Sequence, residues 1–200
     1  MPSRSSSPPL CVNGAIRYRR RDVLASAPWE VPMADVSAVL AANREAVSDL
    51  IAASDRCSAC WTAPRAPGKW SPSQIVEHVA RSIEESANMM AGAPTKFVTL
   101  PFFVRPLART LLFKRVLRTG GFPKAKTNKA MNPASGPAMT SEARTRLEGA
   151  LARFDRELRA RAQSSDSVTS SAFGTVPLTD YARFIEIHTR HHTRQMPAVV

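Results

Sequence analysis

The chain is short of the features that mark secreted and membrane proteins. It has three cysteines, Cys11, Cys57 and Cys60, which are too few for a disulfide framework and favour a reducing compartment. No run approaches the roughly 18 consecutive apolar residues that a membrane-spanning helix needs. The N-terminus carries arginines but lacks the apolar stretch of a secretory signal. We therefore expect a cytoplasmic protein.

Acidic residues are missing from a long internal stretch. Between Ser86 and Ser141 there is no Asp or Glu, whereas nine basic residues occur there and account for most of the net charge of +12. The basic residues are Lys96, Arg105, Arg109, Lys114, Arg115, Arg118, Lys124, Lys126 and Lys129. A solvated basic face is the favoured interpretation. The alternative is a positive field that gathers an anionic ligand, with Arg105 and Arg109 as candidates for guiding it.

Helical periodicity is missing from the first 32 residues. Residues 3–9 are rich in Ser and Pro, and residues 17–21 hold four arginines. This composition predicts a disordered basic tail at 1–32, followed by one domain at 33–200. Met33 stands directly before the first amphipathic segment, so a natural start at Met33 is one interpretation. A basic arm that binds nucleic acid is the alternative.

Alternating apolar patterns of the length that predicts strands are also missing, and the rest of the chain has helical spacing. Four main helices are expected: 33–54; one that Ser71 caps, with Gln74 completing a capping box; 140–162; and one that Thr179 caps and that ends just before Pro197. A shorter helix is expected over 106–118, ended by Gly120. The fold expected is an all-α four-helix bundle with long connections.

Histidine is scarce, and its placement is informative. His188 and His192 are separated by four residues, so on a helix they share a face, and that face also carries apolar residues. His78 lies on the apolar side of the helix that begins after Ser71, and antiparallel packing would place it at matching depth. Three imidazoles with open coordination positions would suit zinc, nickel, iron or manganese. The alternative is a partly exposed polar cluster at a fraying helix end. Gln195 and His191 would flank the ligands.

Two blocks of sequence resemble a known family. They are PGKWSPSQIVEHVARS (67–82) and FGTVPLTDYARFIEIHTRHHTRQM (173–196), and the chain resembles the DinB/YfiT-like superfamily over 34–196. It is most similar to a branch of uncharacterised bacterial proteins. The resemblance implies a four-helix bundle with a divalent ion at His78, His188 and His192. It also implies relatives that include thiol S-transferases, an isomerase and many proteins of unknown reaction. Ser171-Ala172 and Thr189-Arg190 depart from the residues common in relatives.

Two functions therefore remain open. The first is a metal-dependent enzyme, of thiol S-transferase or hydrolase type, that activates a low-molecular-weight thiol or water against a small-molecule substrate. The second is a non-catalytic metal-binding module whose basic helix docks on nucleic acid or a membrane surface. We expect the small molecule rather than nucleic acid or membrane as partner, and a homodimer stays open. The Cys57-x-x-Cys60 pair lacks a thioredoxin-like or zinc-finger context and is interpreted as incidental.

Overall fold

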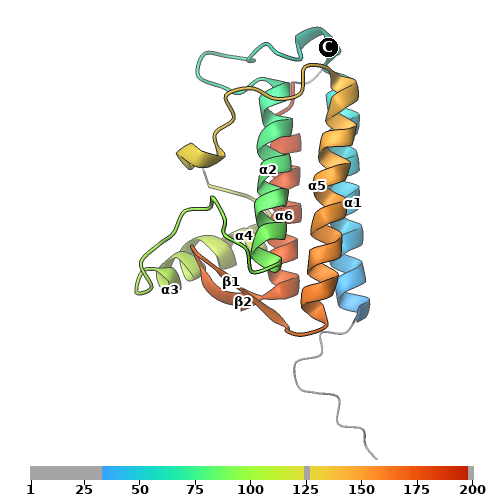
Figure 1. Ribbon diagram of the computed structural model, residues 1–200. Helices are drawn as coiled ribbons and strands as arrows, with labels where there is room; N and C mark the ends of the chain where they lie inside the picture. Colours follow the sequence, from blue (N-terminus) through green and yellow to red (C-terminus); the bar gives the residue numbers. More distant parts are fainter. Residues whose placement is uncertain (1–32, 124–126, 198–200) are drawn as a thin grey trace, which may run out of the picture.

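Four long helices stand side by side in the computed structural model, which describes residues 33–123 and 127–197 (Figure 1). They are α1 (Met33–Asp55), α2 (Pro72–Met90), α5 (Thr140–Ala162) and α6 (Leu178–Thr193). The expected all-α four-helix bundle is confirmed. The tail predicted at 1–32 lies outside the described residues. None of the described helices combines the length and apolar character needed to cross a bilayer.

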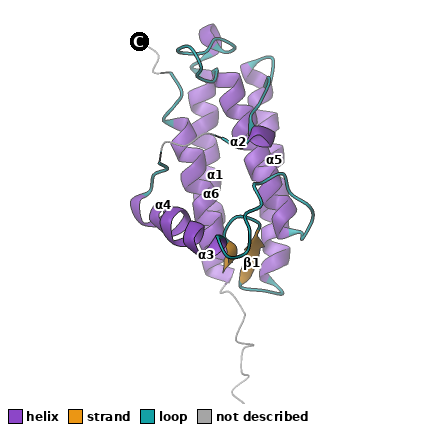
Figure 2. Ribbon diagram, turned by 90° about the vertical axis from the view of Figure 1, so that its left-hand side faces the viewer, coloured by secondary structure: helices purple, strands orange, loops and turns teal. Residues whose placement is uncertain are grey.

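The direction of the helices explains the long connection. Helix α1 packs on α5 and α6, and α2 packs mainly on α5 and also on α6. Figure 1 shows α2 and α5 running the same way, whereas α6 runs opposite to α2. Because α2 and α5 are parallel, the chain between them must return along the length of the bundle. The described parts of this return, residues 91–123 and 127–139, cover one side of α2 and α6 (Figures 1 and 2).

The start of α2 is fixed by its own sequence. The Ser71 hydroxyl accepts a hydrogen bond from the Gln74 amide, and the Gln74 side chain accepts one from the Ser71 amide. Pro72 occupies the first helical position, where a missing N–H costs nothing. The capping box predicted from the sequence is therefore confirmed. It fixes where α2 begins, and the helix that follows buries Ile75, His78 and Val79.

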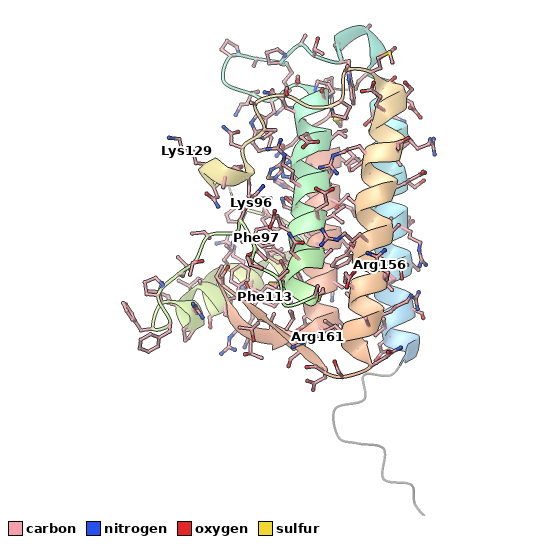
Figure 3. The ribbon with its side chains drawn as sticks, in the orientation of Figure 1. Lys96, Phe97, Phe113, Lys129, Arg156 and Arg161 are labelled. Carbon is pink, nitrogen blue, oxygen red and sulfur yellow. The ribbon has the colours of Figure 1, made fainter. Side chains whose placement is uncertain are left out.

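The short helix of the connection contains a turn that periodicity did not predict. It consists of α3 (Arg105–Ala108), a π-helical turn at Arg109–Phe113 and α4 (Lys114–Thr119). Gly120 ends it at a φ of 65°, in the left-handed region that glycine tolerates. The buried Phe113 and Val116 hold this helix against the bundle. Figure 3 labels Phe113 at the lower end of the bundle, where its ring packs on Phe184 of α6 with centroids 5.2 Å apart.

A β-hairpin replaces the loop expected before the last helix. Strand β1 (Ser167–Ser170) pairs antiparallel with β2 (Gly174–Pro177), with Val168 opposite Val176. The expectation of no strands is wrong here because each strand has four residues, too few for an alternating pattern to stand out. Gly174 follows a three-residue loop and adopts a φ of 71°, as short hairpin loops require.

The cap predicted for the last helix is also wrong. Helix α6 begins at Leu178, its cap position is Pro177, and no side chain makes a capping hydrogen bond there. The chain passes directly from β2 into α6, and the Leu178 amide donates to the Asp166 carbonyl at 2.8 Å. Thr179 therefore lies inside the first turn, because the hairpin decides where the helix starts.

Candidate metal centre

Three histidine side chains converge where α2 and α6 pack antiparallel. His78 comes from α2, and His188 and His192 come from successive turns of α6. The Nε2 atom of His188 lies 3.3 Å from that of His78 and 3.2 Å from that of His192. Across residues 33–123 and 127–197, this is the only group of three or more His, Cys, Asp or Glu residues placed to share an ion. The structure thus brings the three sequence-predicted ligands together.

Two of the rings are oriented by hydrogen bonds on the far nitrogen. The Nδ1–H of His78 donates to the Met131 carbonyl at 2.9 Å, and the Nδ1–H of His192 donates to Gln195 Oε1 at 3.0 Å. The Gln195 amide nitrogen in turn donates to His191 Nε2 at 2.9 Å. With the protons held on Nδ1, the Nε2 lone pairs of His78 and His192 are free to bind an ion. This is the arrangement that metal-ligating histidines usually have.

Burial keeps the three imidazoles neutral. It lowers the pKa of His78, lowers the pKa of His188 well below its ordinary value, and lowers the pKa of His192 to about 3. The closeness of His78 and His191, whose protonated forms would repel a charge on His192, lowers its pKa further. Neutral imidazole is the form that ligates metals. At neutral pH the three histidines can therefore bind a metal ion without first losing a proton from a charged imidazolium.

The donor set fits a divalent ion. Metal–nitrogen distances of 2.0–2.1 Å in a tetrahedral site place ligand nitrogens about 3.3 Å apart. The observed separations from His188 Nε2 are 3.3 and 3.2 Å. The buried Nδ1 of His188 has no hydrogen-bond partner among the described residues. Nitrogen lone pairs at these separations repel one another unless a proton or a cation lies between them. The three histidines could therefore bind a metal ion.

The three histidines face a cavity of about 1040 Å³. Its lining includes six aromatic side chains besides the histidines, namely Trp70, Phe97, Phe122, Phe173, Tyr181 and Phe184. It includes the basic residues Arg65 and Lys69 but no Asp or Glu from the described residues. Figure 3 shows Phe97 on the connection beside α2, and Phe97 is one of the residues that line the cavity. A ligand in this space would meet apolar walls and no negative side chain.

Aromatic rings pack directly on the histidines. The centroid of the Trp70 ring lies 4.6 Å from that of His78, and the Trp70 Nε1–H donates to Asn132 Oδ1 at 2.9 Å. The Phe122 ring lies 5.3 Å from that of His188. The contribution of Phe122, Met131 and Asn132 could not be predicted from the sequence, since they lie on an irregular connection without any periodic signal. The contact of Trp70 with His78 is local in the sequence, because Trp70 directly precedes the cap residue Ser71 and His78 lies in the second turn of α2.

The structure does not bring Arg105 and Arg109 to the cavity. The Arg105 side chain donates to the Leu100 carbonyl at 2.8 Å, and Arg109 donates to the Thr175 carbonyl at 3.0 Å. Both arginines thus hold the connection against itself and against the hairpin, and neither lines the cavity. Arg65 and Lys69, which precede α2, line the cavity instead and are placed where basic residues could guide an anionic ligand into it.

Other residues noted in the sequence lie away from the centre. Arg190 forms ion pairs with Glu45 and Asp49 of α1, so it fastens α6 to α1 instead of facing the cavity. Cys57 and Cys60 are free thiols outside the cavity lining, and the Cys57 thiol donates to the Pro197 carbonyl.

A family model for the DinB superfamily matches residues 40–196. The chain belongs to the DinB superfamily. The match spans most of the described bundle and contains all three converging histidines. Neither the curated proteins nor the solved structures gave a significant match. The assignment to the DinB superfamily therefore fixes the fold and agrees with a three-histidine centre, while the reaction has to be argued from the site itself.

Proposed function

We propose that this DinB-superfamily protein is a metal-dependent enzyme that acts on a small substrate. His78, His188 and His192 would hold one divalent ion, which when bound lowers the pKa of a thiol or a water and so supplies a nucleophile near neutral pH. The observation that carries the proposal is the convergence of three Nε2 atoms at the wall of a cavity of about 1040 Å³. Structural zinc sites are usually closed by a fourth protein ligand. No such ligand joins the group in the described residues.

The cavity supports a substrate with an apolar body and an anionic group. Rings of Phe97, Phe173 and Phe184 would pack on the apolar part, which they shield from water. Arg65 and Lys69 are the basic residues of the lining among those that the structure describes, and they would hold a carboxylate or phosphate of the substrate or of a thiol co-substrate. The absence of Asp and Glu from the described lining removes the main source of repulsion. A transfer or hydrolysis reaction on such a molecule fits this lining best.

The remaining polar residues position the ligands and do not react. Met131 and Gln195 hold the two Nδ1 protons, which keeps the Nε2 lone pairs of His78 and His192 directed at one point. Trp70 packs at a tilt against the rings of His78 and His192, with centroid distances of 4.6 and 5.9 Å, and limits their rotation. A non-catalytic metal-binding module is the competing function, and turnover separates the two.

Elemental analysis of protein purified without a metal-affinity tag tests the centre. We expect one divalent ion per chain in the parent protein and none in His192→Ala, with unchanged helical circular dichroism. His191→Ala is the matched control and should keep its metal, because His191 contacts Gln195 and does not belong to the converging group. Equal metal loss in both variants would contradict the assignment of ligands.

A screen for thiol transfer and hydrolysis, run on the metal-loaded protein, tests catalysis. Low-molecular-weight thiols carrying carboxylates should be turned over with apolar electrophiles, and His192→Ala should lose this turnover together with its metal. A loaded protein that binds such thiols but shows no turnover with either thiols or water would favour the non-catalytic module.

A further inference from the structure

An apolar surface lies exposed at the start of the short helix, away from the cavity. Phe102 and Phe103 are 79% and 70% exposed, and their rings pack edge to face with centroids 5.6 Å apart. One and two turns further along, Leu107 and Leu111 are 59% and 63% exposed. Exposed apolar residues are ordinary singly, but four in ten consecutive positions mark a contact surface.

The basic residues of the same helix continue this surface. Lys114, Arg115 and Arg118 are exposed on α4, directly after the apolar residues. None of the three forms an ion pair with any residue in the described parts of the chain. We call residues 102–118 with these seven exposed side chains the α3–α4 face. Its first half is apolar and its second half is cationic.

The helix cannot turn this face inward. Phe113 and Val116 are buried on its opposite side, and Phe113 packs on Phe173 and Phe184 with ring centroids 5.2 Å from each. Arg109 also fixes the helix to the hairpin through the Thr175 carbonyl. Because Phe113 and Val116 already pack on the bundle, the helix cannot rotate to bury Phe102, Phe103, Leu107 and Leu111, and these side chains stay exposed to solvent. Figures 1 and 2 show this helix beside the bundle, where its outer face has no neighbouring helix from the described part of the chain.

The combination of apolar and cationic residues indicates which kind of partner could bind the α3–α4 face. A second copy of this face would bring the same cations together, and like charges oppose contact. Nucleic acid would satisfy the cations but leave exposed phenylalanines without an apolar partner. A bilayer with anionic lipids satisfies both halves, because acyl chains accept the apolar residues and headgroup phosphates accept Lys and Arg.

Although the sequence alone favours a small-molecule partner over a membrane, we propose that the α3–α4 face docks on the surface of an anionic lipid bilayer. Phe102 and Phe103 enter the boundary between headgroups and acyl chains, together with Leu107 and Leu111. The cations of α4 bind lipid phosphates beside them. The contact is peripheral, since the helix lies along the surface and does not cross it. This inference does not depend on the metal centre.

Co-sedimentation of the full chain with vesicles tests the proposal. The protein should bind vesicles of phosphatidylcholine with phosphatidylserine and should bind pure phosphatidylcholine much more weakly. The variant Lys114→Gln, Arg115→Gln, Arg118→Gln should lose affinity for the anionic vesicles by roughly a hundredfold, at about 1 kcal/mol for each cation. The charge-matched control is Arg56→Gln, Arg156→Gln, Arg183→Gln, which should bind nearly as the parent does. Figure 3 shows Arg156 on α5, on the other side of the bundle.

The apolar half is tested separately. Phe102→Ser with Phe103→Ser should weaken binding to the same vesicles by about tenfold. Met139→Ser is the control, because Met139 is 59% exposed but lies outside the face. Vesicle binding that survives both sets of changes would arise elsewhere on the chain and overturn the proposal. A change from dimer to monomer in the Phe variant without loss of vesicle binding would also overturn it, since a second copy would then cover the face.

Discussion

Gln195 contacts two histidines at once and is the residue that fixes the orientation of His192. Its Oε1 accepts the His192 Nδ1–H at 3.0 Å, and its amide nitrogen donates to His191 at 2.9 Å. Without that acceptor, His192 can move its proton to Nε2, and the lone pair is lost to the ion. Hydrogen bonds of this kind raise the basicity of a ligand and hold its tautomer. Gln195 was expected from the sequence to flank the ligands, and its placement agrees.

Replacing Gln195 should therefore weaken metal binding without removing a ligand. We expect Gln195→Ala to lower affinity for zinc by about 10- to 100-fold, measured by competition with a chromophoric chelator. Gln195→Glu keeps an acceptor at the same position and should retain the parent affinity. If Ala and Glu weaken binding equally, the hydrogen bond to His192 has no part in ligation.

At the scale of elements, the connection before α5 acts as one wall of the centre. It supplies the Met131 carbonyl to His78 and the Asn132 side chain to Trp70. The connection is fastened to the start of α2 by two side chains. Ser73 Oγ donates to the Pro137 carbonyl at 2.7 Å, and the side-chain Nε2 of Gln74 donates to the Pro133 carbonyl. The orientation of His78 therefore depends on a loop that is more than fifty residues away in the sequence.

Gly136 makes this close approach to α2 achievable. A Cβ atom built at Gly136 would overlap the backbone carbonyl of Ser73. We expect Gly136→Ala to lower the free energy of unfolding by about 1–3 kcal/mol, because the loop must move off α2. Chemical denaturation followed by circular dichroism would measure this.

Gly149→Ala is the matched control for that substitution. Gly149 lies in α5 with open space around its Cβ position, so alanine should raise stability by about 0.5–1 kcal/mol. A Gly136→Ala protein as stable as the parent would show that the loop contact on α2 is dispensable.

At the scale of the whole molecule, one ion would link two helices of opposite direction. His78 lies on α2, while His188 and His192 lie on α6, and these helices otherwise contact each other less than they contact α5 and α1. An ion that binds the folded bundle and not the unfolded chain stabilises the fold by mass action. Thermal stability therefore reports occupancy of the centre, independently of any activity.

Adding zinc at about 100 times its dissociation constant should stabilise the metal-free protein by about 2.7 kcal/mol. For a chain of this size that corresponds to a rise in Tm of roughly 5–11 °C, measured by differential scanning calorimetry. His188→Ala should show no zinc-dependent rise, while His191→Ala should show it in full. A rise that persists in His188→Ala would place the ion elsewhere.

Much of the fold could be predicted because its signals are local. The capping box at Ser71 and Gln74, the period of 140–162 and the stop at Gly120 each depend on a few neighbouring residues. The hairpin at 167–177 escaped because its strands are short, and the turn of π-helix within 105–119 escaped because one extra residue hardly disturbs the apolar spacing.

The sequence by itself determined that His188 and His192 share one helical face, since four residues make about one turn. Only the tertiary structure decided that His78 meets them, that Met131 and Gln195 hold their protons, and that Arg105 and Arg109 stay out of the cavity. The physical reason is the distance along the chain over which each interaction acts. Helical spacing and caps act over a single turn, whereas the centre and the α3–α4 face depend on how distant segments pack, which no local pattern encodes.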